Sequence, residues 1–149
     1  MKKIFITFLF ILLTSCDYTP IYSTENSKFK LNQIEVDGNK KINKLILRKI
    51  SRLQKTESNL IYDLDIISSE QINSISKDSK GNTTVLEMII STNINVKKNN
   101  FIIKKYNFSE NFTYKNNSNK FELKQYEKDI QNTMIEKIVE NLILNLGTI

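Results

Sequence analysis

Residues 84–97, TVLEMIISTNINVK, decide the fold of this chain, because apolar and polar side chains alternate along the stretch. The even-numbered positions are mainly apolar and include Leu86, Met88, Ile90, Ile94 and Val96. The odd-numbered positions are mostly polar and include Glu87, Ser91, Asn93, Asn95 and Lys97. Successive side chains of a strand point to opposite faces of its sheet. The stretch therefore predicts a long strand with one apolar face that needs a cover.

Three further strands are predicted around this one. Residues 29–36 suit a strand with an irregularity near Gln33, and residues 60–67 alternate regularly. A polar turn region follows from Ile75 to Thr83, and Asn99-Asn100 is a tight turn before a strand over residues 102–114. That last strand places its aromatic residues on one side, which Lys104 and Glu110 interrupt: Tyr106, Phe108, Phe112 and Tyr114. Short turns between the last three strands predict an antiparallel meander.

Two amphipathic helices are predicted, one on each side of the meander in sequence. The first begins after Asn39, a suitable N-cap, and places apolar residues at helical spacing: Ile42, Leu45, Ile46, Ile50 and Leu53. The basic side of this helix could bind phosphate or lipid, but basic residues on a helix more commonly just form its solvent-exposed face. The second follows Asn119 and Glu122, which have the spacing of a capping box, and ends near Gly147. Its wide apolar stripe favours packing on a sheet over a coiled-coil arm.

The element order is therefore β-α-β-β-β-α. Each helix has one apolar side, and a sheet with one apolar face needs a cover. The sequence predicts an α+β fold in which a four-stranded, mostly antiparallel sheet carries two helices packed on one face. We expect this single domain to span residues 28–149.

The first sixteen residues have the layout of a secretory signal. Lys2 and Lys3 precede the apolar run of residues 4–13, and the small residues Thr14 and Ser15 precede Cys16. The run is too short to span a membrane, since a spanning helix needs about 20 apolar residues. Two interpretations give Cys16 no special role: the segment is an ordinary cleaved signal, or it is an anchor that is not cleaved.

The residue inventory narrows the chemistry. The chain has no histidine, and Cys16 is its only cysteine. The common Cys/His nucleophile pairs, Ser-His-Asp triads and most zinc or copper sites are therefore excluded. Asp63 and Asp65 share a predicted strand face, and such a pair of carboxylates can act in general acid–base catalysis. A solvent-exposed sheet face is the commoner reason for such a pair. We expect that the protein is not an enzyme and that it has no cofactor, no metal site and no nucleic-acid partner.

Leu13-Thr14-Ser15-Cys16 resembles the lipobox of bacterial lipoproteins. The resemblance implies that residues 1–15 are a signal peptide and that the Cys16 thiol receives diacylglycerol. It also implies that the new amino terminus is acylated and that residues 16–27 form a lipidated lead. Two or more acyl chains give lasting membrane attachment, because each buried methylene contributes roughly 0.8 kcal/mol.

The mature opening Cys16-Asp17-Tyr18-Thr19-Pro20-Ile21-Tyr22 resembles that of the LPS-assembly lipoprotein family LptE, of the alphaproteobacterial type. Tyr106, Phe112, Tyr114 and Tyr126 match the same family around the last strand and helix. This resemblance implies a non-enzymatic lipoprotein on the periplasmic side of the outer membrane. There it would plug the barrel LptD, assist its assembly and take part in lipopolysaccharide transport. Asp17 stands where the family usually has glycine, which leaves the inner membrane as an alternative location.

Lys97 and Lys98 precede the Asn99-Asn100 turn, and Lys104 and Lys105 follow it. We expect these four residues to contact glycolipid phosphate, because lysine binds phosphate as a point charge. Protection of the strands against aggregation is the alternative role. For the whole protein, the alternative function is an accessory lipoprotein subunit of another periplasmic lipid-transport complex. An enzyme would need a Ser-Lys pair or carboxylates, and the chain contains only 3 glycines and no glycine-rich nucleophile turn.

Overall fold

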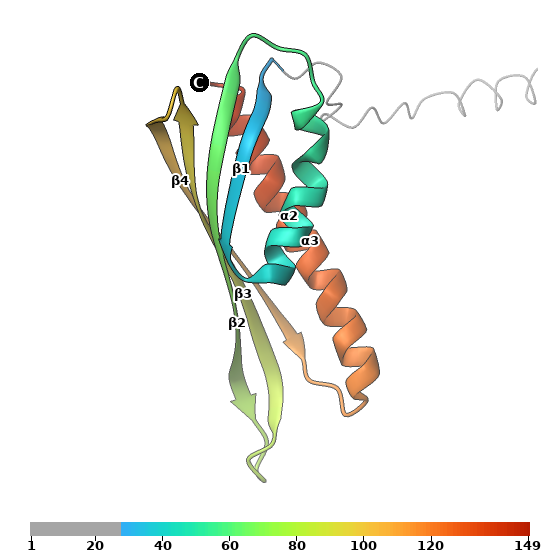
Figure 1. The fold of residues 1–149 in the computed structure, drawn as a ribbon. Coiled ribbons are helices and arrows are strands. Elements are labelled where there is room, and N and C mark those ends of the chain that lie inside the picture. Colours follow the sequence, from blue (N-terminus) through green and yellow to red (C-terminus); the bar gives the residue numbers. More distant parts are fainter. Residues whose placement is uncertain (1–27) are drawn as a thin grey trace, which may run out of the picture.

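The structure, a computed structural model, describes residues 28–149. The predicted signal peptide, Cys16 and the predicted lead of residues 16–27 lie outside the described residues. The elements follow one another in the chain as β1 (Lys30–Gly38), α2 (Lys40–Ile50), the 3-10 helix η2 (Ser51–Gln54), β2 (Ile61–Lys77), β3 (Thr83–Lys98), β4 (Phe101–Lys115) and α3 (Lys120–Leu146) (Figure 1).

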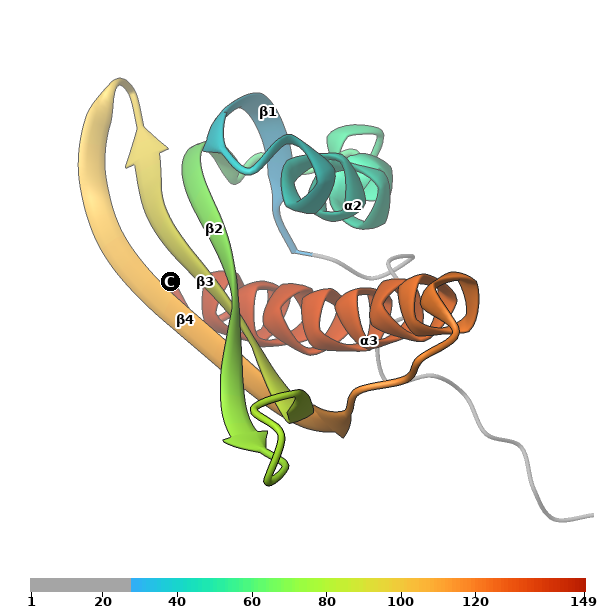
Figure 2. The ribbon, with the colours of Figure 1, turned by 90° about the horizontal axis from the view of Figure 1, so that it is seen from below.

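The four strands form one sheet in the order β1-β2-β3-β4. β1 pairs parallel to β2, while β2–β3 and β3–β4 are antiparallel hairpins. A parallel pair needs a crossover connection, and α2 supplies it. Both helices lie on the same side of the sheet (Figure 2). The predicted α+β fold and its element order are confirmed.

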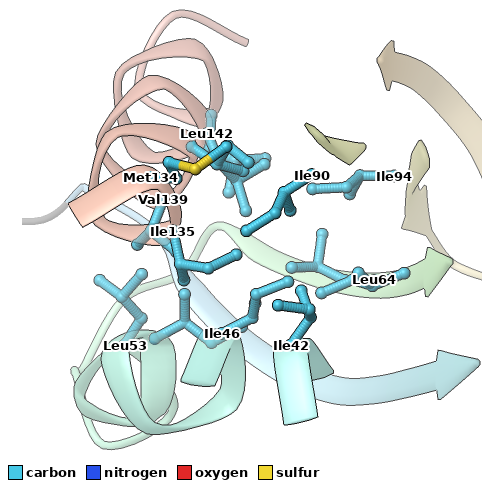
Figure 3. Close-up of a cluster of buried hydrophobic side chains, with 14 of the residues drawn as sticks. Ile42, Ile46, Leu53, Leu64, Ile90, Ile94, Met134, Ile135, Val139 and Leu142 are labelled. Carbon is cyan, nitrogen blue, oxygen red and sulfur yellow. The ribbon is translucent and has the colours of Figure 1, made fainter. Parts of the chain in front are cut away.

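The core lies between this sheet face and the two helices (Figure 3). The even-numbered, apolar positions of residues 84–97 face this core, since Met88, Ile90, Ile94 and Val96 are buried. α2 contributes Ile42, Ile46 and Ile50, and the middle of α3 contributes a buried stripe that includes Met134, Ile135, Ile138, Val139 and Leu142. α3 therefore covers the sheet, and the coiled-coil alternative is excluded.

Both predicted helix starts are confirmed. The Asn39 side-chain oxygen accepts hydrogen bonds from the backbone N–H of Lys41 (3.0 Å) and Ile42 (3.2 Å). The Asn119 oxygen does the same for Phe121 and Glu122. Glu122 accepts a bond from the Asn119 side-chain amide at 2.8 Å, and the Asn119 backbone N–H donates instead to Asn117. Only one half of the capping box therefore forms.

The irregularity predicted near Gln33 is also present. The register between β1 and β2 shifts between Leu31 and Ile34. Asp63 Oδ1 accepts hydrogen bonds from the Gln33 backbone N–H (2.8 Å) and from the Asn32 amide (3.0 Å). The carboxylate therefore provides partners for two donors at the irregular point of the edge strand.

The prediction for β2 was wrong in its length. The strand does not end at residue 67 but continues to Lys77, so the connection to β3 is shorter than the turn expected from Ile75 to Thr83. Residues 71–77 are all exposed and lack an apolar alternation. They remain extended because they pair with β3, for example Ile72 with Met88 and Ser74 with Leu86. The resulting β2–β3 ribbon projects beyond the end of β4 (Figure 1).

Candidate functional site

The β3–β4 hairpin turn brings the four candidate lysines into one small region. Asn99 and Asn100 both have positive φ values, 52° and 66°. Two consecutive residues with positive φ are typical of the hairpin turn whose twist matches that of the flanking strands, and asparagine tolerates this conformation better than most residues. Lys98 pairs with Phe101 directly across the turn.

The strand register divides these lysines between the two faces of the sheet. Lys104 lies opposite Val96, whose side chain is buried on the helix side. Lys105 lies opposite Asn95, on the other face. The register shifts between Val96 and Lys97, next to the turn. The hairpin therefore presents positive charge on both faces.

Lys97 is already engaged within the domain. Its Nζ lies 2.6 Å from Asp65 Oδ2, and the hydrogen bond to Asp65 raises the pKa of Lys97. Asp63 is engaged by Asn32 and Gln33, as described above. Each of the two carboxylates considered for acid–base work thus has partners that stabilise the sheet.

Lys98, Lys104 and Lys105 remain available. All three are exposed, and within residues 28–149 none of them forms an ion pair. They enclose three exposed apolar residues: Phe101 is 76% exposed, Ile102 48% and Ile103 41%. We call residues 98–105 the hairpin tip. Its apolar component was missed by the sequence analysis, although the run KKNNFIIKK at 97–105 contains the signal.

A second basic site lies between the helices. A groove of about 460 Å³ is lined by four lysines, one carboxylate and two uncharged residues: Lys41, Lys44 and Leu45 of α2, and Lys124, Glu127, Lys128 and Gln131 of α3. The predicted basic side of α2 therefore faces α3 in part, and Arg48 also donates a hydrogen bond to Asn132 of α3. The groove is a second place where an anion would find several ammonium groups.

The aromatic residues that carry the family resemblance join β4 to α3. Tyr114 is buried, its ring packs against Tyr126 with centroids 6.0 Å apart, and its hydroxyl donates to Glu127 at 2.8 Å. Burial raises the pKa of Tyr114, and the bond to Glu127 adds to the effect. Tyr106 donates to the Asn145 carbonyl at 3.4 Å. These contacts are structural.

Two other kinds of site were sought in the same part of the chain. Among residues 28–149, no group of three or more acidic side chains is arranged to hold a metal ion. None of the helices in this range is both long enough and apolar enough to cross a membrane.

Comparison with known proteins places the fold among lipoproteins. The rare lipoprotein B of Shewanella oneidensis is similar over 78% of this chain and 98% of its own, with a TM-score of 0.56 and 15% identity. A minor lipoprotein from Acinetobacter baumannii is similar over 82% and 92%, with a TM-score of 0.57 and 10% identity. An uncharacterized lipoprotein B from Nitrosomonas europaea is similar over 81% and 88%, with a TM-score of 0.52 and 10% identity. No family model and no curated protein matches the sequence. At these identities the likeness establishes a common fold.

Proposed function

We propose that this chain is a lipid-anchored, non-catalytic lipoprotein on the periplasmic side of the outer membrane. It lodges in the lumen of the barrel LptD, assists the assembly of that barrel and takes part in moving lipopolysaccharide to the outer leaflet. The observation that carries the proposal is the fold shared with the rare lipoprotein B structure over 98% of that chain. The lipobox at Cys16 and the opening heptad support it independently.

The uncovered face of the sheet supports a role inside a polar lumen. In register across β3 and β4, Ser91 lies opposite Ser109 and Asn93 opposite Asn107. These positions alternate with the buried Ile90 and Ile94, so their side chains lie on the opposite face of the sheet from the core. Both helices lie on the core side and leave that face open (Figure 2). Barrel interiors are polar, so neutral hydrogen-bonding groups suit a surface that packs against one.

Capture of the partner tests the proposal. We expect the tagged mature protein, extracted in mild detergent, to retain a heat-modifiable outer-membrane barrel. Asn107→Glu, which places a charge on the open sheet face, should reduce that capture. Gln125→Glu likewise adds one negative charge, at an exposed position of α3, and serves as the control.

Recovery of an inner-membrane ATPase complex would favour the alternative function, an accessory subunit of another lipid-transport complex. That outcome would also agree with Asp17, which leaves the inner membrane as an alternative location. Recovery of neither partner, from cells that contain both, would contradict the proposal.

The glycolipid contact is tested at the three available lysines. We expect Lys98→Gln, Lys104→Gln and Lys105→Gln together to weaken lipopolysaccharide binding several-fold, because they remove the unpaired ammonium groups of the tip. Lys77→Gln, Lys80→Gln and Lys115→Gln make the same charge change at the opposite end of the sheet. Equal binding by the two triple variants would exclude the tip as the contact.

A further inference from the structure

We propose that the hairpin tip inserts into a membrane surface: Phe101, Ile102 and Ile103 enter the interface of an anionic bilayer while Lys98, Lys104 and Lys105 bind its lipid phosphates. The inference deepens the proposed function, since it rests on the same anchored lipoprotein and specifies which end faces the lipid.

The exposure of the tip is the first support. Side chains on neighbouring strand positions point to opposite faces, so one helix layer covers only every second residue. Three consecutive apolar residues are exposed at the tip, and Phe101 is the most exposed of them. Apolar surface of this kind gains by leaving water. Aromatic and aliphatic side chains flanked by lysines are typical of protein segments that lie in the interface of a membrane.

The charge of the tip is the second support. Lys98, Lys104 and Lys105 leave the hairpin on both faces. The two acidic residues of β2 on this side of the sheet already have partners, since Asp65 pairs with Lys97 and Asp63 accepts hydrogen bonds from β1. Juxtamembrane lysines are attracted to anionic lipid surfaces within about a Debye length. An apolar tip flanked by lysines that form no ion pair is complementary to an anionic bilayer, whose headgroups are charged and whose interior is apolar.

The surroundings of the tip extend the apolar surface. Leu60 and Ile61 at the start of β2 are exposed, as are Leu144 and Ile149 near the end of the chain. The bond from Tyr106 to Asn145 holds the last turn of α3 beside β4. Figure 1 shows that the start of β1, the β3–β4 turn and the C-terminus lie at the same end of the molecule. The β2–β3 turn at the other end is polar, with the sequence DSKGN at 78–82.

The point where the chain enters the domain is the third support. Lys30 donates its backbone N–H to the Leu60 carbonyl at 2.7 Å, which fixes the beginning of β1 at the end that carries the tip. Residues 16–27 reach at most about 40 Å when fully extended. Acyl chains on Cys16 would therefore hold this end near the bilayer at high effective concentration.

A fluorescence experiment tests the inference directly, because the chain has no tryptophan. The full-length lipidated protein carrying Phe101→Trp is reconstituted into phosphatidylglycerol-containing vesicles with brominated acyl chains. We expect a blue-shifted emission and loss of most of its intensity relative to vesicles without bromine. Phe121→Trp is the matched control, since Phe121 is 81% exposed at the start of α3, at the opposite end. Its emission should remain unquenched.

Two further arms identify the ligand. In the Phe101→Trp background, Lys98→Gln, Lys104→Gln and Lys105→Gln together should reduce the quenching in anionic vesicles. The same substitutions should have a smaller effect in vesicles of phosphatidylcholine, whose surface carries no net charge to attract the lysines. A blue shift produced by lipopolysaccharide below its aggregation threshold, without quenching in brominated bilayers, would replace the bilayer with a single bound glycolipid. Equal quenching at positions 101 and 121 would overturn the inference.

The failure of this inference and that of the proposed function are distinguishable. Phe101→Ser with Ile103→Ser should abolish the contact with the bilayer and leave capture of the barrel intact. If that variant loses thermal stability, Phe101→Ser alone replaces it, because Phe101 is 76% exposed, and it should still weaken the contact between the tip and the bilayer. Absence of barrel capture by the wild-type chain would contradict the proposed function alone.

Discussion

Gly38 is the residue at which the backbone leaves the sheet for the first helix. Its φ is 88°, and a Cβ atom built there would lie 2.0 Å from the Ser68 carbonyl oxygen. The next residue, Asn39, donates its backbone N–H to that same oxygen at 2.9 Å. The close approach of β1 to β2 at this point leaves no room for a side chain.

Gly38→Ala should therefore lower the free energy of unfolding by at least about 2 kcal/mol, through both backbone strain and displacement of Ser68. Gly81 has a similar φ of 84°, but its Cβ would meet no atom within 4 Å. Gly81→Ala should lower the free energy of unfolding by only about 1 kcal/mol. Urea unfolding measures the free energy of unfolding of both variants, and the difference between them gives the cost of the clash with Ser68 beyond backbone strain. Equal losses of free energy would contradict the role assigned to Ser68.

Thr92 is a polar residue in the apolar row of β3. It is 1% exposed, and within the described part of the chain its hydroxyl has no hydrogen-bond partner. Thr92→Val keeps the shape of the side chain and removes the unsatisfied group. The free energy of unfolding should rise by about 1 kcal/mol. Thr92→Ser, which retains the hydroxyl and loses a methyl group, should lower it; a loss for valine as well would indicate a water-mediated partner.

At the scale of single elements, the β2–β3 turn depends on one carboxylate. Asp78 Oδ1 accepts hydrogen bonds from the backbone N–H of Lys80 (2.9 Å) and of Asn82 (2.8 Å), and Oδ2 accepts from the Asn82 amide. The side-chain bond from Asn82 is the largest of the interactions that lower the pKa of Asp78 below 3.8. The charged carboxylate is thus the form that organises the turn.

A group whose folded pKa is lowered stabilises the fold above its unfolded pKa and loses that contribution as the pH falls through the folded pKa. We expect the turn to loosen below pH 3.8. Amide hydrogen exchange and chemical shifts of Lys80 and Asn82 should report the change, and Asp78→Asn should remove its pH dependence. Chemical shifts that do not follow the titration of the Asp78 carboxyl would contradict this assignment.

The elements also separate what a sequence can predict from what it cannot. Helix starts are local, so Asn39 and Asn119 were recognisable as caps. The last part of β2 is set by a partner strand, and SSEQINSISK at 68–77 carries no periodic signal of its own. Glu110 interrupts the aromatic side of β4 because it pairs with a residue of α3: Lys137 Nζ lies 2.6 Å from Glu110 Oε2. A partner 27 residues away in sequence could not be predicted.

The candidate site follows the same rule. The lysines of the hairpin tip were visible in the sequence, because a two-asparagine turn places flanking residues together. The engagement of Lys97 by Asp65 was not, since it depends on the register between β2 and β3. The exposure of Phe101, Ile102 and Ile103 was equally hidden, because an apolar run at a strand start is as common in a core as on a surface.

At the scale of the whole molecule, one core joins the sheet to both helices, so damage to α3 should affect the entire domain. Leu142 is fully buried, whereas Leu144 on the same helix is half exposed. Leu142→Ala should lower the free energy of unfolding by about 2–5 kcal/mol. Leu144→Ala should lower it by no more than about 1 kcal/mol. Denaturation followed by circular dichroism measures both, and similar losses would indicate that α3 is docked in a different rotation.

The parallel placement of β1 has a mechanical consequence. β1 is both an edge strand and the strand that joins the preceding segment of the chain, and its pairing runs from Lys30 to Gly38 along β2. Tension applied through that segment, with the rest of the domain held in place, acts along the strand axis. All of the β1–β2 hydrogen bonds then share the load in shear, instead of opening one after another from the end.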